Sequence, residues 1–200
     1  ESLVVLFDEW SAIEINDQPV FAEMIRSTLI GGKHLGIKFA CIPFLTQLSE
    51  ANDSGQTIGF PIGEEVFIDV DLDRLCSPYA NANNVTIFLF AVLQKHLAGT
   101  ISELKEIDFS EWMQFCLKEL FEGYGPITEL VKASAGVPRD FLRIFNRSIQ
   151  GCQGILPLTS RKIRRTTHEF FQEEKAILIQ RRPEVSSLFE DIFDKICVPS

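Results

Sequence analysis

The feature that most constrains the fold is a short apolar segment followed by two acids at the start of the chain. Residues 3–7 form a continuous apolar run, the pattern of a strand covered on both faces of a parallel sheet. Such a strand would bring Asp8 and Glu9 to the carboxyl edge of the sheet, where open α/β sheets bind ligands. There an Asp can hold Mg²⁺ through water, and a Glu can orient or deprotonate an attacking water. The alternative is an ordinary strand that ends in two solvated acids.

The next forty residues predict a βαβ unit. Asn16 and Asp17 are helix-start residues, and apolar residues at helical spacing follow over 20–29 before a Gly-Gly stop. A second apolar run over 37–42 predicts the next buried strand. The order strand, helix, strand implies a crossover connection and a parallel sheet with helices on both faces.

The remaining segments predict a loop, a third strand and then helices only. We expect a loop over 52–63 and a third strand over 65–70. Helical periodicity with capping residues then predicts helices at 72–77, 84–97, 110–122, 127–134, 138–149, 159–180 and 184–196.

Two further segments carry residues that could contact a nucleotide. Thr46 and Gln47 follow the second predicted strand, where a polar side chain would contact a γ-phosphate, although a Pro-Phe-Leu insertion precedes them. A plain polar loop is the alternative there. Arg139 lies in the first turn of a predicted helix, from which an Arg can reach a phosphate. The alternative is that Arg139 pairs with Asp140 or with a helix end.

Together these segments resemble a known family. Residues 4–13, followed by Gln18-Pro19, are similar to the Walker B segment of bacterial AAA+ ATPases related to the origin-recognition initiators. Residues 67–73 resemble the stretch that leads into the helical lid of that family, and residues 136–141 resemble its sensor-2 motif. Residues 158–175 resemble the helix that follows the lid.

The resemblance implies roles for three residues and the identity of the cofactors. Asp8 would be the magnesium-side carboxylate, Glu9 the water-activating carboxylate and Arg139 the sensor 2. ATP and Mg²⁺ would be the cofactors. The implied function is a nucleotide-dependent switch in DNA transactions or phage defence, working as a homo- or hetero-oligomer. For a trans-acting arginine finger, Arg26 and Arg74 are candidates only.

The implied fold is an α/β parallel-sheet fragment of a P-loop NTPase core, followed by an all-helical lid and C-terminal helices. The core would span residues 1–71, the lid residues 72–150, and a C-terminal helical segment residues 151–200. This last segment would begin a winged-helix-like domain.

The phosphate-binding loop of the family is missing from these 200 residues. The sequence contains no G-x-x-x-x-G-K-[ST], and Gly31–Lys33 lacks the leading Gly and the final hydroxyl. In this fold that loop precedes Walker B, so it would lie upstream of Glu1. We expect these residues alone not to hydrolyse ATP. A degenerate, non-hydrolysing interaction platform is the alternative function. A DExx-box helicase is less favoured, because no Ser-Ala-Thr-type motif follows the second strand.

Charge is distributed unevenly along the chain. The net charge is -9, yet residues 139–182 carry 10 Lys and Arg against 4 Asp and Glu. A basic segment in an acidic protein indicates a local contact with an anion, either a nucleotide or a nucleic acid. Arg161, Lys162, Arg164 and Arg165 are the candidate DNA contacts. The alternative is a solvated helix face.

Cysteine usage and hydropathy indicate a cytoplasmic protein. Five widely spaced cysteines without a C-x-x-C pair predict buried free thiols in a reducing compartment, rather than disulfides or a metal site. The nearest candidate for a membrane span, Val85–Leu93, is too short to cross a bilayer and predicts a buried helix. We therefore expect no membrane partner.

Overall fold

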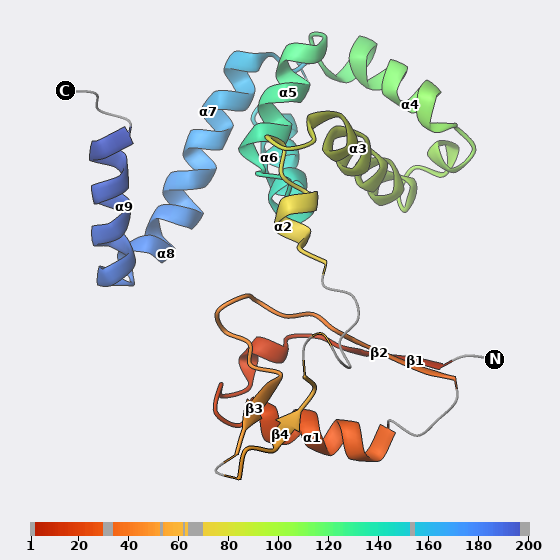
Figure 1. Cartoon of the computed structure of the whole chain (residues 1–200). Coiled ribbons are helices and arrows are strands. Elements are labelled where there is room, and N and C mark those ends of the chain that lie inside the picture. Colours follow the sequence, from red (N-terminus) through yellow and green to blue (C-terminus); the bar gives the residue numbers. More distant parts are fainter. Residues whose placement is uncertain are drawn as a thin grey trace. The chain divides into compact units, whose positions relative to one another are not determined.

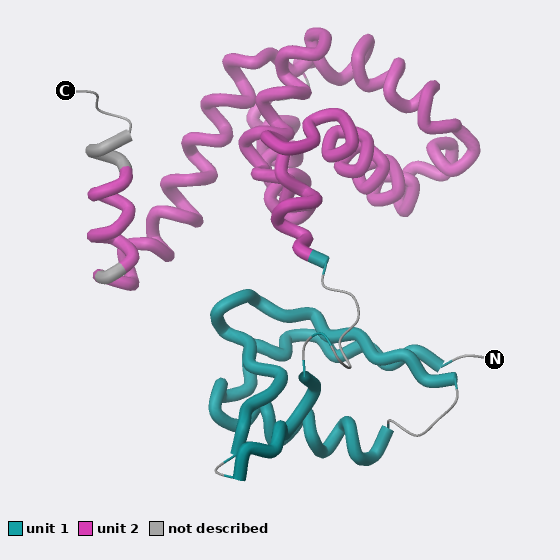
Figure 2. Tube along the Cα trace, viewed as in Figure 1, with its two compact units in different colours: residues 1–70 teal, residues 71–200 magenta. Residues whose placement is uncertain are grey.

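The computed structural model of the chain describes residues 3–29, 34–52, 54–61, 63, 70–152 and 155–196. At residue 184 and residues 193–196 this description covers the backbone alone. The chain forms two compact units, residues 1–70 and residues 71–200 (Figure 2). The described elements are mostly helices, together with a small parallel sheet and a short hairpin.

The first unit contains the predicted strand–helix–strand arrangement. Strands β1 (Leu3–Phe7) and β2 (Leu35–Phe39) pair in parallel, with Phe7 opposite Phe39. Helix α1 (Gln18–Leu29) lies between them in sequence (Figure 1). Strand β2 starts two residues earlier and ends three residues earlier than the predicted 37–42, because the chain turns after Ala40 instead of continuing the pairing.

A hairpin replaces part of the expected loop over 52–63, so that prediction was wrong for this stretch. Strands β3 (Ser49–Ala51) and β4 (Thr57–Gly59) pair antiparallel. The turn between them is organised by the side chain of Asn52, whose Oδ1 accepts hydrogen bonds from the backbone N–H groups of Ser54 and Gln56 at 3.0 and 2.8 Å. Most of the predicted third strand, 65–70, lies outside the described residues and stays a prediction.

The core of the first unit is small and aromatic. Trp10, Ala22 and Phe60 are buried, and the ring of Phe39 lies 4.9 Å from Trp10 and 5.2 Å from Phe7 between centroids. Side chains alternate between the two faces of a strand, and Leu6 on the other face is 70% exposed. The expectation that β1 is covered on both faces is therefore wrong for the described residues, because the core packs against one face only.

The second unit is helical, as predicted, with bounds close to those expected from periodicity. Its α-helices are α2 (Leu72–Leu75), α3 (Ala82–Ala98), α4 (Phe109–Phe115), α5 (Tyr124–Ala133), α6 (Pro138–Gln150), α7 (Ser160–Phe170), α8 (Ala176–Gln180) and α9 (Pro183–Ile196). A short 3₁₀ turn, η2 (Ser102–Lys105), precedes α4. Two π-helical turns, η3 (Cys116–Leu120) and η4 (Phe171–Lys175), continue α4 and α7. None of the helices in the described part of the chain is long and apolar enough to cross a membrane.

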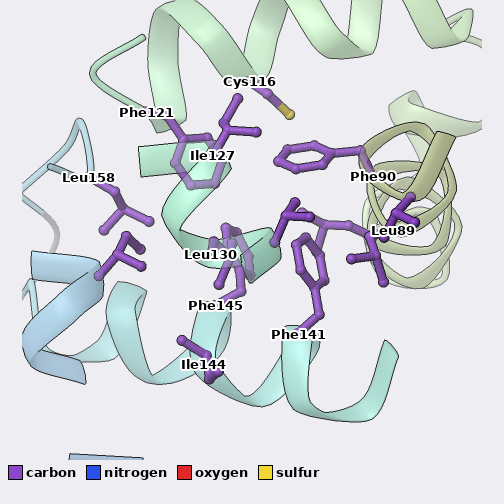
Figure 3. Packing of buried hydrophobic residues seen from close by; sticks show 14 of the residues in the cluster. Leu89, Phe90, Cys116, Phe121, Ile127, Leu130, Phe141, Ile144, Phe145 and Leu158 are labelled. Atoms are coloured by element: carbon purple, nitrogen blue, oxygen red, sulfur yellow. The ribbon is translucent and has the colours of Figure 1, made fainter. Parts of the chain in front are cut away.

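One apolar core holds the second unit together. Phe90 of α3, Leu130 of α5 and Phe141 of α6 meet in its centre (Figure 3). Ile163 and Phe170 bring α7 into the same core. The segment from residue 151 onward, which we expected to form a separate C-terminal part, thus begins with a helix that shares its core with helices of residues 72–150.

The cysteines differ in their exposure, which corrects the expectation that all of them are buried. Cys116 is buried, and burial raises the pKa of its thiol to about 12. Cys76 and Cys152 are partly exposed, and Cys41 is exposed because it lies in the turn after β2. Cys197 lies outside the described residues.

Thiol reactivity should follow this order of exposure. With an alkylating reagent at pH 8, we expect Cys116 to react at least about 100-fold more slowly than Cys41, because only the accessible thiolate is nucleophilic. Peptide mapping by mass spectrometry after timed quenching measures both rates. Equal rates in the folded protein would contradict the buried position of Cys116, and denaturant should make the two rates converge.

Candidate functional site

The two acids at the end of β1 lie on an exposed turn with a constrained backbone. The side chains of Asp8 and Glu9 are both exposed, and the backbone N–H of Glu9 donates to Asp8 Oδ1 at 2.9 Å. Glu9 has φ 54° and ψ 34°, the left-handed conformation that favours Gly and Asn. The next residue, Trp10, is buried, and its backbone N–H donates to the Ala40 carbonyl at 3.3 Å. A Glu in this conformation is energetically unfavourable, and such strain often accompanies functional sites.

This backbone conformation predicts the effect of a substitution on stability. Glu9→Asn should stabilise the first unit by about 0.5–1 kcal/mol, because Asn adopts the left-handed conformation at lower cost. The matched control is Glu14→Asn, an exposed acid whose backbone φ is not positive. Hydrogen exchange of the Ala40 amide, which is bonded to the Phe7 carbonyl, reports the stability of this edge. Faster exchange in Glu9→Asn than in the wild type would contradict the prediction.

The turn after β2 is attached to the loop after β1 through Ser11. The hydroxyl of Ser11 accepts from the Ile42 N–H at 2.8 Å and lies 3.1 Å from the Thr46 hydroxyl. The Thr46 hydroxyl in turn donates to the Ile42 carbonyl at 2.9 Å. Thr46 therefore lies at the same edge of the sheet as Asp8, but its hydroxyl is engaged in contacts within the chain.

Gln18 provides a second link across this edge. Its side chain is fully buried, and Nε2 donates to the carbonyls of Ile13 and Leu45 at 2.9 and 3.0 Å. Its Oε1 accepts from the Gln47 N–H at 2.7 Å. Gln18 thereby fixes the loop after β1 and the turn after β2 to the start of α1. The Gln47 side chain points to Glu50, with 3.5 Å between Nε2 and Oε2.

Ser11 and Gln18 were not predicted as site residues. The sequence offers only a weak signal for them, since a polar residue next to a buried Trp or before a helical Pro is usually a solvated cap. Their partners in the turn after β2 lie 27–35 residues away, so these contacts depend on the crossover that brings β2 beside β1.

Arg139 belongs to the second unit, where its side chain is exposed at the start of α6. Within the described part of the chain Arg139 has neither an ion pair nor a side-chain hydrogen bond. Asp140, the expected alternative partner, instead pairs with Lys175 at 2.7 Å. The structure thus brings Asp8, Glu9 and Thr46 to one edge of the first unit and presents Arg139 on the second.

The candidate DNA-contacting residues are partly engaged within the chain. Arg164 pairs with Glu129 at 2.6 Å, a contact that lowers the pKa of this carboxyl, and Arg165 lies 3.5 Å from Glu169. The Lys162 ammonium donates to the Gly151 carbonyl. Arg161 is exposed and has no ion pair among the described residues.

The residues at the β1 edge fit the metal side of a nucleotide site. Mg²⁺ is usually held by one or two carboxylates together with waters and substrate phosphates. Asp8 retains an oxygen that is not bonded to Glu9 N–H, so it can hold the ion through water. Among the described residues no three His, Cys, Asp or Glu side chains cluster to hold a metal by themselves. These 200 residues contain no G-x-x-x-x-G-K-[ST] motif to hold the phosphates, and Gly31–Lys33 lies outside the described residues.

Comparisons with protein-family models, with curated proteins and with solved structures found no match for this chain.

Proposed function

We propose that this chain is part of an AAA+-type, ATP-dependent switch in which Asp8 and Glu9 form the carboxylate side of the nucleotide site. The observation that supports it most is the placement of both acids at the carboxyl end of a strand in a parallel sheet, with Glu9 in the unfavourable left-handed conformation. In this proposal Asp8 would hold Mg²⁺ through water, and Glu9 would orient the attacking water. When bound, the ion would stabilise charge on the transferred phosphoryl group.

Arg139 completes the proposal as the residue that senses the nucleotide. An exposed guanidinium that has no partner among the described residues is available to contact a γ-phosphate and to transmit its presence to the helical unit. DNA contacts by residues 161–165 do not enter the proposal, since three of the four cations already bind within the chain.

The proposal is tested first at the level of the gene. We expect the coding region upstream of Glu1 to encode a strand followed by G-x-x-x-x-G-K-[ST], and the protein encoded by the complete gene to bind ATP in the presence of Mg²⁺. Calorimetric titration measures this binding. A gene without such a motif, together with a protein that does not bind nucleotide, would refute the switch.

Removal of the Arg139 guanidinium should weaken ATP binding. In the protein encoded by the complete gene, we expect Arg139→Ala to lower ATP affinity by about tenfold, through loss of a charge-assisted hydrogen bond to phosphate. Calorimetry with ATP and ADP measures the effect, which should be larger for ATP. Arg143→Ala is the matched control, because Arg143 lies on the same helix and pairs with Glu174. Unchanged ATP affinity in Arg139→Ala would assign this residue a structural role only.

The second candidate function is a non-hydrolysing interaction platform. It is favoured by the turn after β2, because the Thr46 hydroxyl and the Gln47 N–H are both used within the chain. A platform would retain the fold and bind partners without nucleotide turnover. ATP binding without any hydrolysis in the protein encoded by the complete gene would support this alternative.

A further inference from the structure

A π-helical turn interrupts the long helix of the C-terminal part. The turn η4 joins α7 to α8, so the helix continues on both sides of it. The backbone N–H of Ala176 donates to the carbonyl of Phe171, five residues earlier, where a regular α-helix would use the carbonyl of Gln172. Turns of this kind are rare inside helices and frequently mark functional sites.

The local sequence does not explain this turn. Residues 172–176 are all strong helix formers, and residues 158–182 contain neither Gly nor Pro. The other π-turn, η3, lies at the end of its helix, since Phe121 after it is extended, and helix ends often adopt such wider turns. The π register of η4 therefore depends on tertiary contacts.

Three consecutive side chains of η4 form ion pairs with α6. Four contacts of 2.5–2.7 Å join the two elements: Glu173 with Arg147, Glu174 with Arg143 and with Arg147, and Lys175 with Asp140. Positions 140, 143 and 147 lie on the same side of a helix, because residues three and four apart are neighbours on its surface. One face of α6 thus contacts the whole second half of the turn.

This pairing favours the π register over the α register. In an α-helix consecutive residues are about 100° apart, so three consecutive side chains spread over about 200°, more than half of the circumference. A π-turn holds more residues per turn, so the same three side chains span a narrower arc and can all reach α6. Arg147 and Lys175 also lie over the ring of the buried Phe170, at 5.6 and 5.7 Å from its centroid, which adds cation–π attraction.

A change of register would reorient the helices that follow. Loss of the extra residue in the turn rotates the rest of the helix by about 100° and shifts it by about 1.5 Å along its axis. The helices α8 and α9 carry exposed apolar side chains, among them Leu178 and Leu188, whose direction would change. The rings of Phe171 and Phe189, which stack with 6.2 Å between centroids, would separate because they lie on opposite sides of the turn.

We propose that η4 is a two-register switch. The ion pairs with α6 hold the π register, and their loss lets η4 return to the α register and reorients α8 and α9. The switch responds to salt and to charged partners that compete for these side chains, because exposed ion pairs weaken when they are screened. Competing ions can reach the pairs, since the Glu173 and Arg143 side chains are 64% and 53% exposed. None of the residues proposed for the nucleotide site takes part.

The test uses NMR scalar couplings across hydrogen bonds, which identify the carbonyl that accepts from each amide. In the wild-type chain at about 50 mM salt, we expect the Ala176 amide to couple to the Phe171 carbonyl. In the variant Glu173→Gln/Glu174→Gln, we expect it to couple to the Gln172 carbonyl instead. Salt at about 1 M, where charges are screened within about 3 Å, should move the wild type in the same direction.

The matched control is Glu169→Gln/Glu190→Gln. It removes the same number of charges from exposed acids before and after the turn, and neither acid belongs to the pairs with α6 among the described residues. This control should keep the Phe171 coupling and the nuclear Overhauser contact between the Phe171 and Phe189 rings, whereas Glu173→Gln/Glu174→Gln should lose both.

Three results would overturn the switch. The first is a wild-type Ala176 amide that couples to Gln172 at low salt. The second is a Glu173→Gln/Glu174→Gln chain that keeps the Phe171 coupling or the ring contact. The third is a control that loses the coupling, which would indicate a general effect of charge. Circular dichroism checks that each variant keeps its helices. If the double variant unfolds, the wild-type salt titration decides, and a π register retained at about 1 M salt would overturn the proposal.

Discussion

Replacement of Glu9 by Gln is expected to lower ATP turnover of the protein encoded by the complete gene by about 10²–10⁴-fold, with nucleotide binding retained. Gln has nearly the same shape as Glu, and neither residue favours the left-handed conformation observed at this position. The amide cannot accept a proton from the attacking water at neutral pH. The substitution therefore removes the chemistry of the side chain while leaving the turn after β1 intact.

The matched control for this experiment is Glu14→Gln. Glu14 is another exposed acid between β1 and α1, and the proposed site assigns it no role. We expect the Glu14→Gln variant to hydrolyse ATP at the same rate as the wild type. Hydrolysis is measured by phosphate release, and binding is measured separately by calorimetry. Full turnover in Glu9→Gln would remove Glu9 from its proposed role, whereas loss of turnover in both variants would indicate a general effect of surface charge.

Replacement of Gly136 by Ala is expected to destabilise the helical unit by about 3–5 kcal/mol. Gly136 has φ 81°, and a Cβ at this position would lie 1.7 Å from the carbonyl oxygen of Cys76. The substitution therefore adds a steric clash with backbone atoms to the strain of a left-handed Ala. The two segments could separate only if the end of α2 moved away from the start of α6, the helix that carries Arg139.

Gly123→Ala separates these two contributions. Gly123 also has a positive φ, 77°, with ψ −158°, but a Cβ there would meet no atom within 4 Å. Its replacement should cost only the backbone strain, about 1–3 kcal/mol. Urea denaturation followed by helical circular dichroism measures both variants. Equal destabilisation of the two would show that the close approach of Gly136 to Cys76 is absent.

The local patterns in the sequence were sufficient to predict most of the elements. A continuous apolar run predicted β1, and helical spacing predicted the helices of the second unit, because both signals depend on residues close together in the chain. The β3–β4 hairpin was missed because its turn depends on the Asn52 side chain, and the flanking residues do not alternate in polarity. A two-strand parallel sheet beside helices is what the described residues show, and the P-loop core remains a proposal.

The candidate site was predictable in part, for a related reason. Asp8 and Glu9 could be placed at a sheet edge from the strand that precedes them. The hydrogen bonds of Ser11 and Gln18 to the turn after β2 could not be predicted from the sequence, because the strand–helix–strand crossover brings these residues together only in the folded chain. Asp140 pairs with Lys175 instead of the expected Arg139. This pairing likewise depends on how α7 and η4 pack against α6.

The most direct test of the proposed nucleotide site is to locate the metal ion of bound ATP. In the protein encoded by the complete gene, Mn²⁺ can replace Mg²⁺, and the paramagnetic broadening of each backbone amide signal can be measured by NMR. We predict the strongest broadening in the first unit at Asp8, Glu9 and Thr46, with loss of this broadening in Asp8→Asn. Strong broadening elsewhere, with the Glu9 amide unaffected in the presence of bound ATP, would contradict the proposed role of these carboxylates.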